Sequence, residues 1–147
     1  FHGSFDKYES LIDMKGSDLN GSTIQFKAES ASINTASSMR DEHLREADYF
    51  DCKKYPSIEF KSKSVTKNND NTYSVSGELN FHGVTKPVNL IAIENGVFEH
   101  PKTKKTIIGV TIKGTIKRTE FNFAVETSPS ILSDEVEIHA DLEYSKD

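Results

Sequence analysis

The sequence predicts an all-β protein: an antiparallel sheet of about seven strands that closes into a barrel, with one short helix at an end. Three observations support this fold class. Most segments alternate apolar and polar residues, which is typical of strands with one buried face. Clusters of turn-forming residues separate these segments, as in consecutive hairpins. Only one stretch has helical periodicity. Closure into a barrel would remove the exposed edges of such a sheet.

The N-terminal part of the chain predicts two strands joined by a turn. The segment 1–14 alternates weakly and is expected to be one bent strand. The polar cluster 16–22 (GSDLNGS) is expected to be a turn. The segment 23–33 alternates clearly at first and blurs near Ser30, where a bulge or a strand end is expected.

The segment 37–50 predicts the helix. Ser38 suits the N-cap position, and Asp41 and Glu42 follow in the first turn, where the helix dipole favours negative charge. The apolar residues expected on its buried face are Met39, Leu44, Ala47 and Phe50. Tyr55-Pro56 ends this region, because the residue before proline disfavours helix. A lone short helix in a strand-rich chain is expected to plug one end of the sheet or barrel.

The segment 73–93 predicts the clearest hairpin. Every second residue from Tyr73 to Phe81 is apolar or small, and the residues between them are polar. His82-Gly83 is expected to form the turn, because glycine readily adopts a positive φ. The apolar face then resumes with Val88, Leu90 and Ala92.

The remaining strands are predicted from similar alternation. Before the hairpin, Ile58 and Phe60 lie on one face of a strand that precedes a polar turn at 67–71. After it, Asn95-Gly96 is expected to be a second hairpin turn, followed by a short strand at Val97-Phe98. The other predicted segments are a polar loop at 100–105, a long strand at 106–117, an irregular stretch at 121–133 and a last strand at 136–142.

Length and composition restrict the class of protein. The 147 residues are expected to form a single domain, 1–147. A net charge of −5 with interspersed signs argues against nucleic-acid binding, which requires a basic face. The sequence contains no apolar run long enough to be a transmembrane segment. Its one cysteine, Cys52, excludes an internal disulfide.

Motifs for catalysis or metal binding are missing from the sequence. No base or orienting group is placed for Cys52, and the five histidines lack the paired spacing of a metal site. The chain is therefore predicted not to be an enzyme and to need no cofactor. Small inward residues such as Gly77 and Gly114 either make room for a cavity or relieve strand curvature. Arg118 is expected either to pair with a local carboxylate or to meet an anionic head group.

Three motifs follow one another along most of the chain. They are Arg40-Asp41-x-His43-Leu44 with Phe50-Asp51 and Lys54-Tyr55-Pro56-x-Ile58-x-Phe60; Gly77-x-Leu79-x-x-His82-Gly83-Val84-Thr85-Lys86-x-Val88; and Gly114-x-Ile116-x-Arg118-x-x-Phe121 with Ser133-Asp134-x-Val136-x-Ile138. Together they resemble the YceI-like family of bacterial polyisoprenoid-binding proteins. The resemblance implies a lipocalin-like antiparallel β-barrel of about eight strands with a small helix closing one end. It also implies a further strand ahead of Phe1, so we expect the given sequence to be truncated.

The resemblance implies binding, sequestration or transport of a long-chain amphiphilic lipid, either a polyisoprenoid or an isoprenoid quinone, in the barrel interior. Inward parity and the resemblance together predict the ligand-binding residues Ile24, Phe26, Phe60, Val75, Leu79, Phe81, Leu90, Val110, Ile112, Arg118, Phe121 and Ile138. Family members are usually exported, so a periplasmic or secreted location is expected, and a homodimer is among the expected partners. The alternatives are a packed barrel that acts as a structural or interaction module, and a lipid-modifying enzyme that uses His82.

Overall fold

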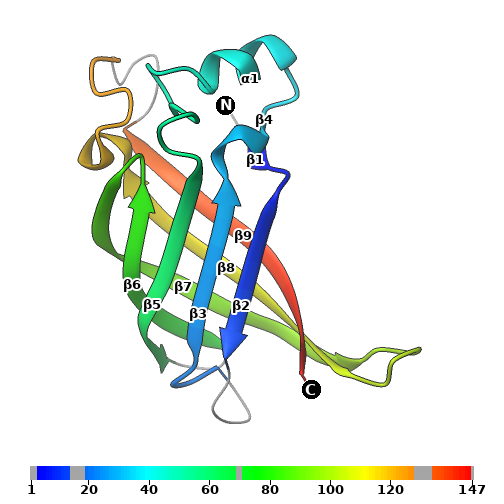
Figure 1. The fold of residues 1–147 in the computed structure, drawn as a ribbon. Coiled ribbons are helices and arrows are strands. Elements are labelled where there is room, and N and C mark those ends of the chain that lie inside the picture. The colour runs from blue at the N-terminus through cyan, green and yellow to red at the C-terminus, as the bar shows by residue number, and fades with distance from the viewer. Residues whose placement is uncertain (1–2, 14–18, 69–70, 128–133, 147) are drawn as a thin grey trace.

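The main feature of the fold is one antiparallel sheet that curls around an apolar core (Figure 1). The computed structural model describes residues 3–13, 19–68, 71–127 and 134–146. Within these ranges, seven strands pair in the order in which they occur along the chain. They are β2 (Tyr8–Asp13), β3 (Thr23–Glu29), β5 (Ser57–Lys67), β6 (Thr72–Phe81), β7 (Val84–Glu99), β8 (Thr106–Lys117) and β9 (Glu135–Lys146). The predicted all-β, antiparallel fold class is confirmed.

The sheet is a half-barrel. Strands β2 and β9 stand at the two ends of the strand order and approach each other, but no ladder of hydrogen bonds joins them in the described ranges. Register is continuous elsewhere, apart from irregularities between Ser62 and Ser64 and between Glu94 and Gly96. At the first of these, the Ser62 hydroxyl accepts a 2.8 Å hydrogen bond from the Ile24 amide, so the neighbouring strand remains attached.

The predicted bent strand at 1–14 is two strands. Strand β1 (Ser4–Phe5) pairs with β4 (Ile33–Asn34), and β2 joins the main sheet. The break occurs because Ser32, in the 3-10 helix η1 (Ser30–Ser32), binds the backbone between the two strands: its carbonyl accepts from the Asp6 amide and its hydroxyl from the Lys7 amide. Strand β3 ends at Glu29, where the sequence predicted a bulge or an end. The ends of the predicted strand, 1–2 and 14, lie outside the described residues, as do residues 16–18 of the predicted turn at 16–22. The described part of this turn, 19–22, is closed by a hydrogen bond from the Ser22 amide to the Leu19 carbonyl.

The predicted helix is shorter than the sequence suggested. Helix α1 spans Ser38–Leu44, and Ser37 rather than Ser38 is its N-cap. The prediction that Met39 faces the core is wrong, since its side chain is 80% exposed. Asp41 is the buried residue of the first turn, because its carboxylate accepts from both the amide and the hydroxyl of Thr35. The helix lies over one end of the half-barrel, as predicted (Figure 1).

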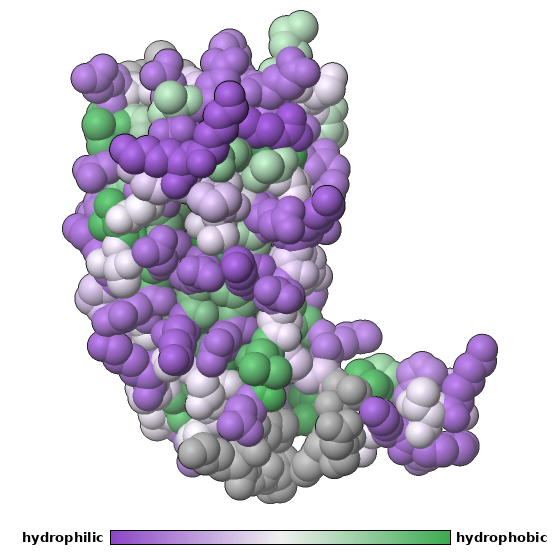
Figure 2. Space-filling model, viewed as in Figure 1, coloured by the Kyte–Doolittle hydropathy of each residue, from purple (hydrophilic) through white to green (hydrophobic). Residues whose placement is uncertain are grey.

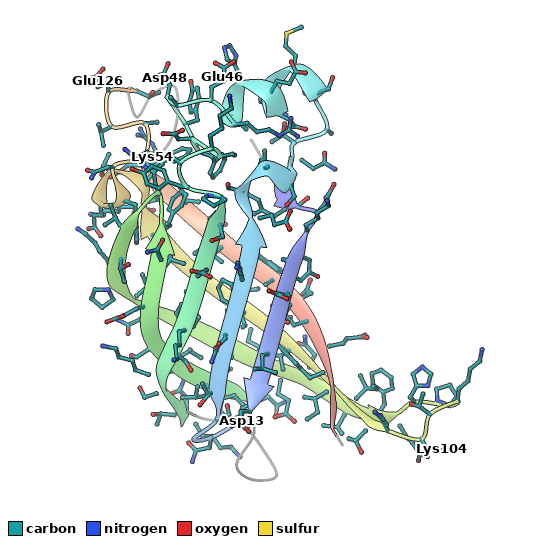
Figure 3. The ribbon with its side chains drawn as sticks, viewed as in Figure 1. Asp13, Glu46, Asp48, Lys54, Lys104 and Glu126 are labelled. Carbon is teal, nitrogen blue, oxygen red and sulfur yellow. The ribbon has the colours of Figure 1, made fainter. Side chains whose placement is uncertain are left out.

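The predicted hairpin turn at Asn95-Gly96 is also wrong. Strand β7 continues through these residues to Glu99, and the chain turns only in the polar loop at 100–105. Asn95 instead donates a 2.7 Å side-chain hydrogen bond to Thr111 on β8, which holds the two strands together at the irregularity. The β7–β8 hairpin therefore projects well beyond the rest of the sheet, with Lys104 near its tip (Figures 1 and 3).

Candidate functional site

The inward face of the half-barrel brings the predicted apolar site residues together. All eleven belong to one hydrophobic cluster or pack against it. Nine have at most 7% of their surface exposed: Ile24, Phe60, Val75, Leu79, Phe81, Leu90, Val110, Ile112 and Phe121. The other two, Phe26 and Ile138, are only partly buried. Period-two parity therefore placed the ten strand residues of this set correctly on the interior face, whereas Phe121, which lies outside the strands, came from the family resemblance. Whether any of the eleven binds a ligand stays a prediction.

Burial is uneven across this interior. The inward residues at the centre of β6, β7 and β8 are almost fully buried, for example Val75, Leu90 and Val110. Several inward residues of the outer strands are only partly buried: Ile12 on β2, Phe26 on β3, and Ile138 and Ala140 on β9. Ile24 on β3 and Leu142 on β9 are buried. The interior thus has a dry floor on β6–β8 and partly accessible apolar walls on both sides of the β2–β9 seam.

The small inward residues do not leave empty space. A Cβ atom added to Gly77 would come within 2.7 Å of the Phe60 ring and 2.8 Å of the Ser62 Cα, and one added to Gly114 would collide with the Leu90 side chain. Because these two residues have no side chain, β5 packs closely against Gly77 and the Leu90 side chain packs closely against Gly114. Of the two readings left open by the sequence, the structure favours close packing at these positions over a cavity.

One end of the interior is closed by aromatic rings beneath α1 and the turns that follow it. Phe123 stacks on Phe81 with 5.3 Å between ring centroids and contacts Phe50 at 4.8 Å. Phe50 also meets Phe5 at 5.6 Å. Sequence reasoning identified Phe81 as a site residue but missed Phe123, because residues 121–127 have no regular periodicity to reveal an inward direction. Charged residues such as Glu46, Asp48, Lys54 and Glu126 surround this closed end (Figure 3).

Arg118 is buried at the same end, with 1% of its surface exposed. It lies in the 3-10 helix η2 (Arg118–Phe121), and its guanidinium donates to the backbone carbonyls of Phe123, Ala124 and Thr127 at 3.2, 2.5 and 2.9 Å. Its charge also contributes to the lowered pKa of the Asp134 carboxyl, although the Thr119 hydrogen bond is the larger cause. The described contacts give Arg118 a structural role in holding the segment that closes the interior.

Lys86 is a second cation at this end and was not singled out from the sequence. It pairs with Leu79 across β6 and β7, so its side chain starts on the inward face, and it is partly exposed. Val84 and Val88 lie two residues before and after it, so the alternation along the strand could have identified Lys86 as an inward residue.

His82 forms the β6–β7 turn together with Gly83, as predicted. Its φ is +54°, an uncommon conformation for a residue other than glycine. The imidazole lies against Tyr55 and Phe123, with centroids at 4.7 and 5.7 Å. Nδ1 is 3.3 Å from the Phe121 carbonyl oxygen, whereas Nε2 is buried and has no hydrogen-bond partner among the described residues.

Three aspartates accept hydrogen bonds from threonine hydroxyls, which lower the pKa of their carboxyls. Hydrogen bonds from Thr35, Thr119 and Thr111 are the largest causes that lower the pKa of Asp41, Asp134 and Asp141 below the ordinary value. Asp41 anchors α1, Asp134 holds η2 against the start of β9, and Asp141 lies on the outer face of β9. These pairs connect elements of the fold, and none is part of the apolar interior.

No group of three or more metal-ligating side chains occurs in the described ranges. Cys52 is partly buried. Among the helices described, none is both long and apolar enough to span a membrane. One depression of about 630 Å³ is lined mainly by outward residues of β2, β3, β5 and β6, including Leu11, Gln25 and Lys61. The face of the molecule seen in Figure 2 is mostly hydrophilic.

A curled antiparallel sheet around an apolar interior, closed at one end by a short helix and aromatic rings, defines a small lipocalin-like β-protein. The YceI-like domain model matches residues 1–144, so the chain belongs to the YceI-like family. A UPF0312 protein of Staphylococcus aureus strain N315 is 34% identical over 150 residues, a match that covers 97% of this chain and 83% of the relative.

Solved structures give the same result. The Campylobacter jejuni YCEI protein is 33% identical, with a TM-score of 0.92 over 99% of this chain and 85% of the other. Burkholderia cenocepacia BcnA is 25% identical, with a TM-score of 0.82 over 97% of this chain and 86% of the other. A polyisoprenoid binding domain from Saccharophagus degradans is 18% identical, with a TM-score of 0.67 over 97% and 84%. At that identity the last match bears on the fold alone.

Proposed function

We propose that this protein binds a long-chain amphiphilic lipid, a polyisoprenoid or an isoprenoid quinone, along the inward face of its half-barrel. The observation that carries the proposal is the half-buried apolar lining beside the β2–β9 seam, which is continuous with the fully buried floor. Each Å² of apolar surface removed from water stabilises a complex by roughly 25 cal/mol, so a long tail can bind without strong polar contacts. The S. degradans domain, which shares this fold, is named as polyisoprenoid-binding, and the proposal extends that ligand class to this chain.

The proposed role is binding without catalysis, and it is tested first by mass spectrometry of an organic extract of the purified, undenatured protein. A long-chain lipid at about one per chain is the expected result. If the extract contains no lipid, and still contains none after the protein has been incubated with prenyl lipids and quinones, the proposal is refuted.

A matched pair of variants locates the bound lipid. Ile138 on β9 is half-buried and faces inward, whereas Ile91 on β7 faces outward and is 42% exposed. We expect Ile138→Lys to reduce lipid retention at least tenfold and Ile91→Lys to leave it unchanged. Ile112 is a poorer choice because it is fully buried, so a charge there would test folding rather than binding. Equal retention by the two variants would place the lipid elsewhere.

A packed barrel acting as an interaction module is the second candidate. It is favoured by the fit of Phe60 and Leu90 into the space over Gly77 and Gly114. The same extraction separates the two candidates, because a packed module would yield no lipid under any loading condition.

Location outside the cytoplasm is part of the proposal, since an exported protein can take up and release lipid at a membrane surface. Fractionation of the bacterium that produces the protein tests this location, and recovery in the cytoplasmic fraction would refute it.

A further inference from the structure

The Nε2 atom of His82 is a buried polar atom that the fold leaves without a partner in the described residues. Leaving such an atom unpaired costs free energy, so an unpaired one calls for an explanation. Aromatic rings lie close to the imidazole: the centroids of Tyr55 and Phe123 are 4.7 and 5.7 Å from its own. The turn residue also adopts a strained positive φ of 54°, and such strain is concentrated at functional sites.

The other ring nitrogen determines what Nε2 can bind. Nδ1 lies 3.3 Å from the carbonyl oxygen of Phe121, and a carbonyl only accepts hydrogen bonds, so Nδ1 carries the proton. In the neutral imidazole, Nε2 is then a lone-pair acceptor. The partner that fits it is a hydrogen-bond donor.

His82 is placed where the apolar interior ends. It directly follows Phe81, and its other neighbours Phe121 and Phe123 belong to the same buried cluster as the floor of the interior. An alkyl or prenyl chain lying along the inward face toward this end would bring its terminal polar group to these rings. Charged residues surround the outside of this end (Figure 3).

We infer that His82 Nε2 accepts a hydrogen bond from a hydroxyl head group of the bound lipid. The inference rests on the proposed lipid-binding function and narrows the ligand class: a prenyl alcohol or a prenyl hydroquinone has the required donor, whereas a quinone carbonyl or an ether does not. His82 is a binding residue in this scheme, and no chemical step is assigned to it.

The test is a competitive binding experiment that measures the preference for one lipid head group over another rather than the total affinity. The protein is loaded with equimolar geranylgeraniol and geranylgeranyl methyl ether, and the retained lipids are extracted and quantified. We expect a preference of roughly five- to tenfold for the alcohol, the ratio that one hydrogen bond of ordinary strength produces. A second experiment compares a prenyl hydroquinone with its quinone under anaerobic conditions. Together the two experiments show whether the protein selects a prenyl alcohol, a prenyl hydroquinone or both.

The variant His82→Asn removes the Nε2 acceptor. Asparagine tolerates a positive φ, and its amide can still donate toward the Phe121 carbonyl. We expect this variant to bind alcohol and ether equally, whereas His43→Asn on the exposed surface of α1 keeps the wild-type ratio. If His82→Asn does not fold, the ¹⁵N resonance of Nε2 in the wild-type protein serves instead, and it should move on adding the alcohol and not the ether.

Two results would overturn the inference. If the wild-type protein retains alcohol and ether equally, the proposed function stands and the role of His82 is refuted, with a bound water as the remaining partner of Nε2. If neither lipid is retained, the proposed function and the inference fail together.

Discussion

Replacing Arg118 by methionine should destabilise the protein by roughly 3–5 kcal/mol. The guanidinium is 1% exposed and donates to three backbone carbonyls, those of Phe123, Ala124 and Thr127. A hydrogen bond from a charged donor contributes roughly 1.5–3 kcal/mol. Three such bonds would together contribute roughly 4.5–9 kcal/mol. Water can reach some of these part-buried carbonyls after the substitution, so the expected loss lies at or below the lower end of this total. Methionine keeps the apolar stem, and the loss therefore measures the donors.

Urea denaturation at pH 7 measures this loss, with Lys117→Met as the matched control. Lys117 precedes Arg118 and is exposed, so its substitution should change stability by less than about 0.5 kcal/mol. Arg118→Lys should lose an intermediate amount, because an ammonium group cannot reproduce the planar fork of donors. Amide hydrogen exchange should show the loss first in residues 121–127. Wild-type stability of Arg118→Met combined with lost lipid binding would refute the structural assignment and restore the head-group role.

Two further changes test the packing and the electrostatics. Gly77→Ala should cost roughly 2–3 kcal/mol, because the added Cβ would collide with the β5 backbone, while Gly109→Ala, where the Cβ meets only Asn95 at 3.7 Å, should be neutral; equal urea midpoints would contradict the close packing. Thr35→Val removes the main cause of the lowered Asp41 pKa. A lowered folded-state pKa gives stability that is present above the ordinary value of 3.8 and lost as pH falls through the folded value, so the deficit of this variant relative to wild type should shrink below about pH 4. A deficit that is constant from pH 7 to pH 3 would exclude this linkage.

The strands were predictable where one face of the sheet is buried along their whole length. Strand β6 is the clearest case, because Tyr73 and Phe81 bound a run in which each inward position contacts the core. The same parity rule would have identified Lys86 as an inward residue, since Val84 and Val88 flank it. Strand β7 was predicted too short, because Asn95-Gly96 has the composition of a turn but uses the Asn95 amide to bind Thr111 on the neighbouring strand.

The helix and the closed end were less predictable, for a different reason. Apolar periodicity predicted a helix up to Phe50, but a single polar contact decided its orientation: Asp41 bound to Thr35 turns Met39 toward solvent. Contacts between a side chain and a distant backbone have no period in the sequence. The three carbonyls that bind Arg118 belong to a segment without regular structure. The sequence therefore could not predict these contacts, and the residue type alone predicted that Arg118 would meet either a carboxylate or a ligand.

The polar groups at the closed end therefore divide into two kinds with different consequences. Arg118 and Asp134 are engaged by the segment that closes the interior, so substituting them should act on stability. His82 uses one nitrogen in the same way, for the Phe121 carbonyl, whereas its other nitrogen is buried near aromatic rings and has no hydrogen-bond partner within the described part of the chain. If His82 served only to hold the turn, the donor at Nδ1 would be sufficient. The side-chain amide of asparagine could supply such a donor, and asparagine adopts this positive φ at lower conformational cost. The presence of an imidazole where asparagine would satisfy the fold is the physical reason to assign Nε2 to a ligand.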